Sequence, residues 1–181
     1  MVNSRLVCKA RAFAESAHAS INHRRKYTGE PYIMHPFEVA KIVSTIPHSD
    51  EMLAAAWLHD TVEDTNVTSL DIHKEFGPIV GRYVWQLTDV STPSYGNRSI
   101  RKAIDRRHTK GAEANVKSIK LADLISNTKS ITEHDLGFAK VYLTEKRLLL
   151  PYLIEGDRSL WTLAFDLVIK GFHSIEQNKY K

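Results

Sequence analysis

The chain has 181 residues, 43% of them hydrophobic and 25% charged, which is typical of a globular protein with a sizeable core. Cys8 is the one cysteine, which excludes a disulfide framework and a cysteine-based zinc site and indicates a reducing, cytoplasmic setting. No apolar run approaches the length of a membrane span. The net charge of +4 favours an anionic ligand, and a phosphate-rich small molecule explains it as well as nucleic acid does.

The first third of the chain predicts three helices. Apolar residues at helical spacing indicate a helix over residues 4–22. Residues 32–36 are expected to be extended, because a residue before proline is biased away from the helical conformation. Pro36 suits the first turn of a second helix over residues 37–46, and Ser49 is a plausible N-cap for a third, largely apolar helix.

Helical patterns continue to the end of the chain. Gly77 and Pro78 separate two short helices expected at residues 68–76 and 79–87, and the irregular residues 88–97 predict a mobile loop. The remaining expected elements are a strongly basic segment at 98–110 and helices at 112–130, 138–153 and 160–175. Strand signals are almost absent and no second domain is visible, so the sequence predicts one all-α domain over residues 1–181.

The third helix leads into an unusually polar stretch. His59 and Asp60 are followed one turn later by Glu63 and Asp64, and helical geometry would place all four on one broad face. An imidazole beside a carboxylate can bind a cation, and the second acidic pair would then lie next to its open coordination position. The stretch therefore indicates either a metal site with an acid/base pair or a solvated helix end.

Residues that bind divalent metals recur in the order His35, His59-Asp60 and Asp123. Two neutral imidazoles and two carboxylates offset a +2 ion and leave positions open for water and substrate. Taken alone, each residue has a simpler explanation. A histidine before a proline is more often a loop residue, and Lys120, one turn before Asp123, is an ordinary partner for that carboxylate.

The ordered residues resemble the H…HD…D signature of the HD superfamily of metal-dependent phosphohydrolases. Further matching segments are Arg24-Arg25-Lys26, Gly29-Glu30-Pro31-Tyr32-Ile33-x-His35-Pro36, His59-Asp60-Thr61-Val62-Glu63-Asp64-Thr65, Phe76-Gly77 and Lys120-Leu121-Ala122-Asp123-x-x-x-Asn127. Together they resemble the hydrolase domain of Rel/SpoT proteins and the stand-alone small alarmone hydrolases, the metazoan SpoT homologue included, over about residues 5–150.

The resemblance implies an all-α HD-domain helical bundle that binds one Mn²⁺ per chain. It implies removal of the 3′-pyrophosphate from guanosine 5′-(di- or tri)phosphate 3′-diphosphate, which gives GDP or GTP plus pyrophosphate and lowers the alarmone of the stringent response. The implied metal ligands are His35, His59, Asp60 and Asp123, and the implied catalytic pair that positions and deprotonates water is Glu63 and Asp64. The implied substrate-binding residues are Arg24, Arg25, Lys26, Arg101, Lys102, Asn127, Ser130 and Tyr142.

Two alternatives stay open from the sequence. The first is an HD-fold phosphatase for another ribose phosphate, such as the 2′-phosphate of NADPH, or a nucleotidase. The second is a nucleotide- or RNA-binding module that uses the basic segments, although few aromatic residues accompany them for base stacking. We expect a cytoplasmic protein whose partner is a small guanosine polyphosphate, without nucleic acid or membrane, and an oligomer is compatible with the sequence.

Overall fold

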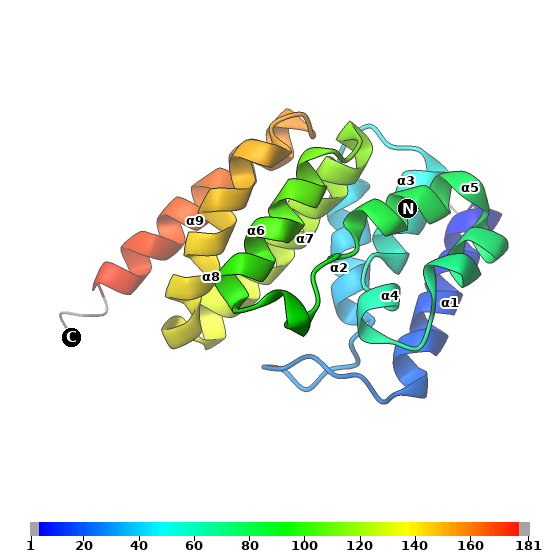
Figure 1. The fold of residues 1–181 in the computed structure, drawn as a ribbon, viewed down its shortest axis with the longest axis horizontal. Helices are drawn as coiled ribbons and strands as arrows, with labels where there is room; N and C mark the ends of the chain where they lie inside the picture. Colours follow the sequence, from blue (N-terminus) through cyan, green and yellow to red (C-terminus); the bar gives the residue numbers. More distant parts are fainter. Residues whose placement is uncertain (1–3, 178–181) are drawn as a thin grey trace.

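The computed structural model describes residues 4–177 (Figure 1). Within that range every regular element is helical, and one isolated β-bridge joins Arg24 to Pro31, which confirms the all-α prediction. The elements are α1 (Arg5–Ser20), α2 (Met34–Val43), α3 (Asp50–Leu58), α4 (Thr61–Asp64), α5 (Ser69–Leu87), the 3₁₀ turn η1 (Pro93–Tyr95), α6 (Arg98–Lys110), α7 (Ala114–His134), α8 (Leu136–Leu149), the 3₁₀ turn η2 (Leu150–Leu153) and α9 (Arg158–Gln177).

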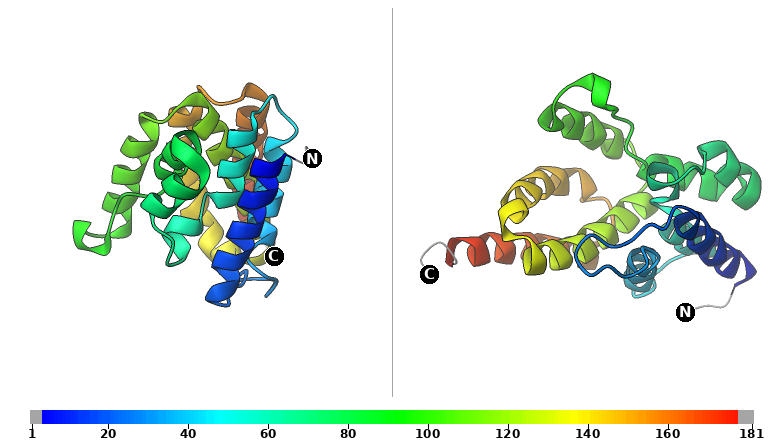
Figure 2. Two further views of the ribbon diagram at one scale, coloured as in Figure 1. Left: turned by 90° about the vertical axis from the view of Figure 1, so that its right-hand side faces the viewer. Right: turned by 90° about the horizontal axis from the view of Figure 1, so that it is seen from below.

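Helix α7 runs through the middle of the bundle. Helices α2, α3 and α5 pack against it from one side, and α8 and α9 pack against it from the other (Figure 1). Helix α1 covers α3, so α1 and α9 lie at opposite ends of the molecule (Figure 2). This arrangement places the polar stretch that follows α3 beside the middle of α7. Among the described residues, no helix combines the length and apolar character that crossing a bilayer requires.

Helix α3 begins as the sequence predicts, because the Ser49 hydroxyl accepts a hydrogen bond of 3.3 Å from the amide of Met52. It ends at Leu58, however, and does not continue through the acidic pair. The His59 ring nitrogen Nδ1 lies 2.9 Å from the carbonyl of Ala56, and the hydroxyl of Thr61 donates to the carbonyl of Leu58. These side chains take carbonyls that a continuing helix would use, so the chain turns before α4.

Helix α2 begins at Met34, Tyr32 and Ile33 form a turn, and Ile33 already has helical φ and ψ of −53° and −21°, so the prediction that residues 32–36 are extended was wrong. Pro36 lies in the first turn, where amide groups have no partner within the helix and the missing N–H of proline costs little. His35 consequently lies one position inside the helix and is 1% exposed. The helix start therefore turns His35 into the protein interior.

The remaining helices match their predictions with local differences. The predicted break at Gly77 is confirmed, since its φ of 83° interrupts α5 with a kink. Helix α7 extends to His134, four residues beyond the predicted end, and Asp135 then caps α8 by accepting from the amide of Phe138 at 3.0 Å. Pro151 falls in the 3₁₀ turn η2 and not in α8, which ends at Leu149.

Candidate metal centre and active site

Three elements bring four metal-binding side chains to one point. His35 lies in the first turn of α2, His59 and Asp60 lie in the turn between α3 and α4, and Asp123 lies in the middle of α7. The two histidine Nε2 atoms are 3.2 Å apart. The Nε2 of His35 lies 3.2 Å from Asp123 Oδ1 and 3.4 Å from Asp60 Oδ2. The Nε2 of His59 lies 3.0 Å from the same oxygen of Asp60.

Outer hydrogen bonds assign the protons of both imidazoles. Ser126 donates its hydroxyl proton to Glu38 over 2.7 Å, so the hydroxyl oxygen accepts from Nδ1 of His35, which lies 3.1 Å away. Nδ1 of His59 donates to a backbone carbonyl. With Nδ1 protonated in each neutral ring, both Nε2 lone pairs face the cluster. Two lone pairs and two carboxylates directed at one point favour a cation between them.

The surroundings of the cluster also favour positive charge. Burial opposes protonation of His59, but the adjacent Asp60 and then Asp123 raise the pKa of His59 to about 9. The hydroxyl of Tyr32 donates to Asp60 Oδ2 at 2.6 Å, and the amide of Asn127 donates to Asp123 Oδ1 at 2.6 Å. These contacts fix the carboxylate oxygens in place.

The cluster fits a metal ion. Ligand atoms of His35, His59 and Asp123 all lie within 4.8 Å of one another, as the ligands of a single ion would. The donor set of imidazole nitrogen and carboxylate oxygen suits first-row divalent ions. The four residues are those that the order of motifs in the sequence predicted, and the structure brings them together from positions far apart in the chain.

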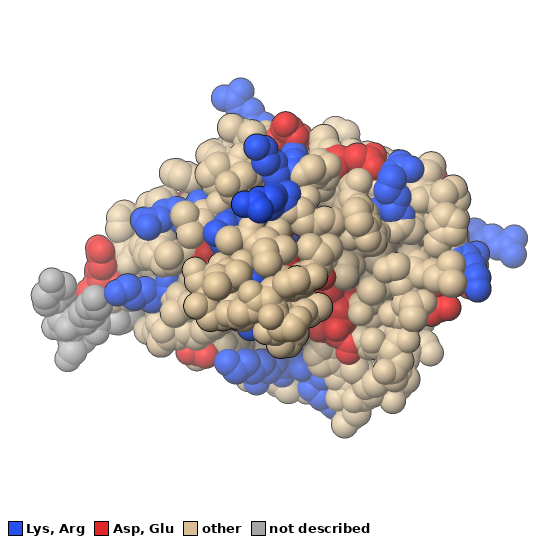
Figure 3. Space-filling model, viewed as in Figure 1, with Lys and Arg blue, Asp and Glu red and all other residues tan. Residues whose placement is uncertain are grey.

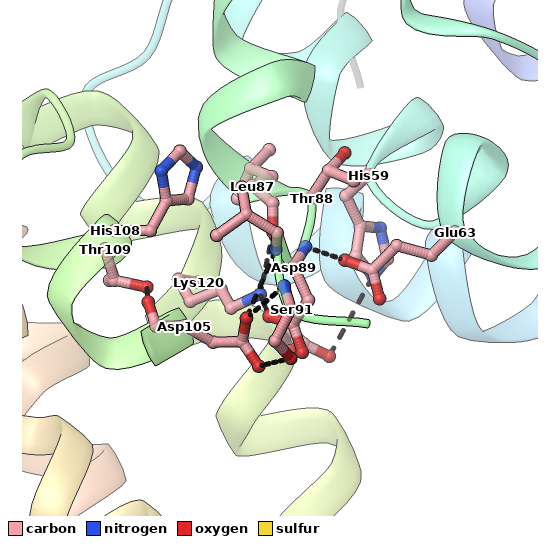
Figure 4. A network of polar contacts seen from close by, with 12 residues as sticks. His59, Glu63, Leu87, Thr88, Asp89, Ser91, Asp105, His108, Thr109 and Lys120 are labelled. Carbon is pink, nitrogen blue, oxygen red and sulfur yellow. Dashed lines mark hydrogen bonds and ion pairs between the residues drawn. The ribbon is translucent and has the colours of Figure 1, made fainter. Parts of the chain in front are cut away.

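Glu63 lies in the cleft next to this cluster and interacts with the loop that follows α5. Its Oε1 accepts a hydrogen bond of 2.6 Å from the backbone amide of Asp89, and Figure 4 shows Glu63 and Lys120 approaching Asp89 from two sides. Solvent reaches Glu63, but the surrounding protein displaces enough water to raise the pKa of its carboxyl to about 7. Asp89 and Asp60 raise this pKa further, while the nearby ammonium of Lys120 lowers it.

Asp64 follows Glu63 on α4 and also lines the cleft. Burial raises the pKa of Asp64 above its usual range, and the charge of Asp60 acts in the same direction. Both acids of the predicted catalytic pair therefore hold protons more strongly than free carboxylates do. A group that can gain and lose a proton near neutral pH suits general acid/base chemistry.

A cleft of about 810 Å³, including space open to solvent, is lined by both acids of the pair and by the carboxylates of the metal cluster. Its walls come from the turn after α3, from α4, and from α6, α7 and α8. Six residues predicted from the sequence line it: Asp60, Glu63, Asp64, Lys102, Asp123 and Asn127. Arg101 lies in an adjoining hollow that shares Glu63 and Lys102 with the cleft.

Besides Arg101, five other predicted substrate-binding residues lie outside the main cleft. Arg25 and Ser130 line a separate groove, together with Ser126. Lys26 forms an ion pair of 3.2 Å with Asp135. Two further predicted residues make local contacts: Arg24 donates to the Asn22 side chain and to the Gly29 carbonyl, and the hydroxyl of buried Tyr142 lies 3.5 Å from the Leu124 carbonyl.

The sequence did not single out several residues that the cleft contains. Asp89 follows α5, and Asp105 on α6 accepts from the amides of Val90 and Ser91 at 3.2 and 2.9 Å. Asp105 also accepts from the Ser91 hydroxyl at 2.8 Å, so the start of the loop predicted to be mobile is tied to α6 (Figure 4). The other lining residues that were not predicted to belong to the site are Arg106, Glu145 and Lys146, together with Tyr32 and Lys120, which were named only as parts of matching motifs.

A family model described as "HD domain" matches residues 10–140. The chain belongs to the HD-domain family. This HD-domain protein is 33% identical over 133 residues to a "GTP pyrophosphokinase rsh" of Brucella ovis, a match that covers 72% of this chain and 17% of the relative. It is 32% identical over 180 residues to a "probable guanosine-3′,5′-bis(diphosphate) 3′-pyrophosphohydrolase" of Synechocystis, covering 97% of this chain and 23% of the relative.

The HD-domain protein thus spans about a fifth of the length of these curated relatives. A solved structure matches more completely. It belongs to a metazoan ortholog of SpoT that is described as hydrolysing ppGpp, with a TM-score of 0.84 and 25% sequence identity. The match covers 94% of this chain and 97% of that one, so nearly all of the bundle has its counterpart in that structure.

Proposed function

We propose that this HD-domain protein is a Mn²⁺-dependent 3′-pyrophosphohydrolase of guanosine 3′,5′-bis(diphosphate) and of the corresponding pentaphosphate. The observation that carries the proposal is the cluster of His35, His59, Asp60 and Asp123, whose two carboxylates line one cleft with Glu63. The matches to a metazoan ppGpp hydrolase and to a bacterial pyrophosphohydrolase support this substrate over other phosphate esters. A cytoplasmic location is part of the same proposal.

His35, His59, Asp60 and Asp123 would hold the metal ion. The ion would act as a Lewis acid toward the phosphate group whose bond to the ribose 3′-oxygen is broken. Asp60 is included as the fourth ligand because its Oδ2 lies 3.0 Å from Nε2 of His59 and points to the same centre. Mn²⁺ is the proposed ion because imidazole and carboxylate donors suit it and because the resemblance to the Rel/SpoT hydrolases implies it.

The reaction is the attack of water on the phosphorus attached to the ribose 3′-oxygen. Glu63 accepts a proton from the attacking water, a role for which a pKa of about 7 is well placed. The bond between this phosphorus and the 3′-oxygen breaks, and the 3′-oxygen takes up a proton. The products are pyrophosphate and GDP or GTP. Asp64, the second acid at the cleft, assists by orienting the water.

The substrate would extend over the metal cluster, from the main cleft to the groove that Arg25 and Ser130 line. Ser126 contacts His35 and also lines the groove of Arg25 and Ser130, so this groove begins next to the cluster. We propose that the purine lies on this side, near Arg24, Arg25, Lys26 and Ser130, and that the phosphates lie in the cleft near Arg101, Lys102 and Asn127.

The distribution of charge argues against the nucleic-acid alternative. Figure 3 shows basic side chains scattered among acidic ones on the face that carries α6, without one continuous basic surface. A protein that follows a nucleic-acid backbone needs such a surface. A small anion bound in a cleft does not.

Product analysis tests the proposed function. The purified protein is mixed with guanosine 5′-diphosphate 3′-diphosphate, with Mn²⁺ or with EDTA, and in parallel with NADPH. We expect GDP and pyrophosphate, only with the metal and faster than NADP⁺ forms from NADPH. Stepwise release of two single phosphates, or turnover of NADPH alone, would replace the substrate and keep the metal centre. Binding of metal without turnover of either compound would favour a binding module.

A further inference from the structure

The charge balance of the cleft is unfavourable for a polyphosphate. Seven carboxylates and four cationic side chains line it within the described part of the chain. Asp60 and Asp123 belong to the metal cluster. Glu145 is held by Arg98 through two contacts of 2.6 and 2.9 Å. An entering anion therefore needs cations that do not already neutralise an acid of the protein.

Two of the four cations are already engaged. Lys102 lies 2.6 Å from one oxygen of Asp89 and 3.8 Å from Asp105. Lys120 donates to the carbonyl of Leu87 at 2.9 Å and lies 3.8 Å from the other oxygen of Asp89. Both ammonium groups thus compensate the acid at the start of the loop, and the pKa of Asp89 stays below its usual range despite burial because of them.

Lys146 on α8 is different. Its side chain lines the cleft, and no carboxylate among the described residues lies within 4.0 Å of its ammonium. The ammonium of Lys146 lies 4.9 Å from the centre of the Tyr142 ring and makes a cation–π contact with it. Tyr142 is buried and lies one turn earlier on α8. Burial lowers the pKa of Lys146, Asp123 opposes this lowering, and Lys120 adds to it.

Such an ammonium gains from an incoming anion more than an exposed lysine does. It is partly buried, so a phosphate oxygen would replace fewer contacts with solvent than at an exposed lysine. Arg106 on α6 is the other lining cation for which the described residues provide no ion pair. Lys146 and Arg106 are therefore the two cations lining the cleft that no acid among the described residues already neutralises.

We propose that Lys146 binds the pyrophosphate group that is removed from the substrate, with Arg106 as the second cation and Tyr142 as a positioning residue beneath the ammonium. Lys146 and the predicted metal ligand Asp123 line the same cleft, so one pyrophosphate can meet both the metal centre and this lysine. The identity of the substrate rests on the proposed function. The anion-binding role of Lys146 rests on the cleft alone.

The test compares Lys146→Met, which keeps the length of the side chain, with Lys146→Arg, which keeps the charge. Lys140→Met is the matched control, because Lys140 lies on the same helix but is exposed and outside the cleft. Binding of inorganic pyrophosphate is measured by calorimetry with and without Mn²⁺. Circular dichroism checks that each variant folds.

We expect Lys146→Met to bind pyrophosphate roughly tenfold more weakly, as loss of a charge-assisted hydrogen bond implies. Lys146→Arg and Lys140→Met should bind it like the unsubstituted protein, and Mn²⁺ affinity should be the same in all four. Equal pyrophosphate affinity of Lys146→Met and the unsubstituted protein in both conditions would overturn the proposal. Absence of pyrophosphate binding by the unsubstituted protein in both conditions would overturn it too.

The same measurements separate this inference from the proposed function. If the protein does not hydrolyse the alarmone but binds pyrophosphate in a Lys146-dependent way, the function is wrong and the anion site remains. If it hydrolyses the alarmone and Lys146→Met shows unchanged KM and unchanged inhibition by pyrophosphate, the function remains and the inference is wrong.

Discussion

The backbone amide of Asp89 donates a hydrogen bond of 2.6 Å to the carboxylate of Glu63, 26 positions earlier in the chain. The proposed base is therefore oriented by a loop and not by its own short helix. The same loop is tied to α6 through Asp105, which receives hydrogen bonds from the two residues after Asp89. The proposed proton transfer at Glu63 would thus depend on a chain of contacts that begins on α6.

Substitution of Asp105 tests that dependence. Asp105→Ala removes the acceptor for the amides of Val90 and Ser91 and for the Ser91 hydroxyl, so the loop should no longer hold Glu63 in place. We expect kcat to fall roughly ten- to a hundredfold, as displacement of a catalytic group does, with Mn²⁺ affinity unchanged. Ser91→Ala removes one contact of the three and should cost much less. An unchanged kcat in Asp105→Ala would mean that Asp105 does not orient Glu63 through the loop.

The pH dependence of turnover tests the role of Glu63. Its pKa of about 7 in the metal-free protein means that the deprotonated, proton-accepting form increases as the pH rises toward neutrality. A bound cation would lower the pKa of Glu63, so kcat should rise with pH and then level off, with the midpoint of the rise at or below about pH 7. Glu63→Gln should keep Mn²⁺ and lose this limb together with most of kcat. A change confined to KM would assign Glu63 to substrate binding.

The same raised pKa predicts how stability depends on pH. Protonated Glu63 is favoured by the fold, so its contribution to stability is present below its usual pKa of 4.5 and is lost as the pH rises toward about 7. Metal-free Glu63→Gln should lack this loss, because its amide does not ionise. Thermal unfolding at pH 5 and pH 8 with EDTA measures the difference between the two proteins. An identical pH response in both would contradict the raised pKa.

Most of the helices follow from local sequence. The cap at Ser49, the apolar run of α3 and the break at Gly77 are determined by neighbouring residues, so the sequence predicts them. The end of α3 and the start of α2 do not follow from apolar spacing, caps or prolines, which predicted both wrongly. His59 and Thr61 end α3 by bonding to its last carbonyls, and the inward position of His35 accompanies contacts made by the folded site.

The residues of the candidate site also fall into those that sequence motifs predict and those whose role depends on the packing of the helices. His35, His59 and Asp123 could be predicted, because metal-binding residue types in a family order are visible in a sequence. Lys146 could not, because a lysine on an amphipathic helix looks the same whether it faces solvent or a cleft. Its significance depends on which acids the other lysines neutralise, and that is known only once the helices are packed.

Removal of Asp60 tests the fourth proposed metal ligand. Asp60 Oδ2 lies 3.0 Å from Nε2 of His59. Burial raises the pKa of the Asp60 carboxyl, but neighbouring groups, His59 foremost, together lower it more, so this pKa stays below its usual range. Asp60→Ala should lose bound Mn²⁺ and turnover together. Metal content after gel filtration and product formation are measured side by side, with the exposed Asp166→Ala of α9 as control. Full activity of Asp60→Ala would remove this residue from the site.

Ser126 allows a test of the proton assignment of His35 without touching a ligand. Its hydroxyl donates to Glu38 and accepts from Nδ1 of His35, which leaves the Nε2 lone pair directed at the cluster. Ser126→Ala removes the acceptor, so the ring loses its preference for this tautomer. Loss of such an outer contact lowers metal affinity by roughly ten- to a hundredfold, and we expect Mn²⁺ titration to show a decrease of that size.

The control for Ser126 is Ser174→Ala, an exposed serine of α9 whose hydroxyl also bonds to a neighbour within the protein. If the tautomer argument holds, raised Mn²⁺ concentration should restore turnover of Ser126→Ala, because the ligands themselves are intact. An Mn²⁺ affinity equal to that of the control would mean that Ser126 does not set the tautomer of His35. Lost turnover that excess Mn²⁺ does not restore would instead assign Ser126 to the substrate groove that it lines.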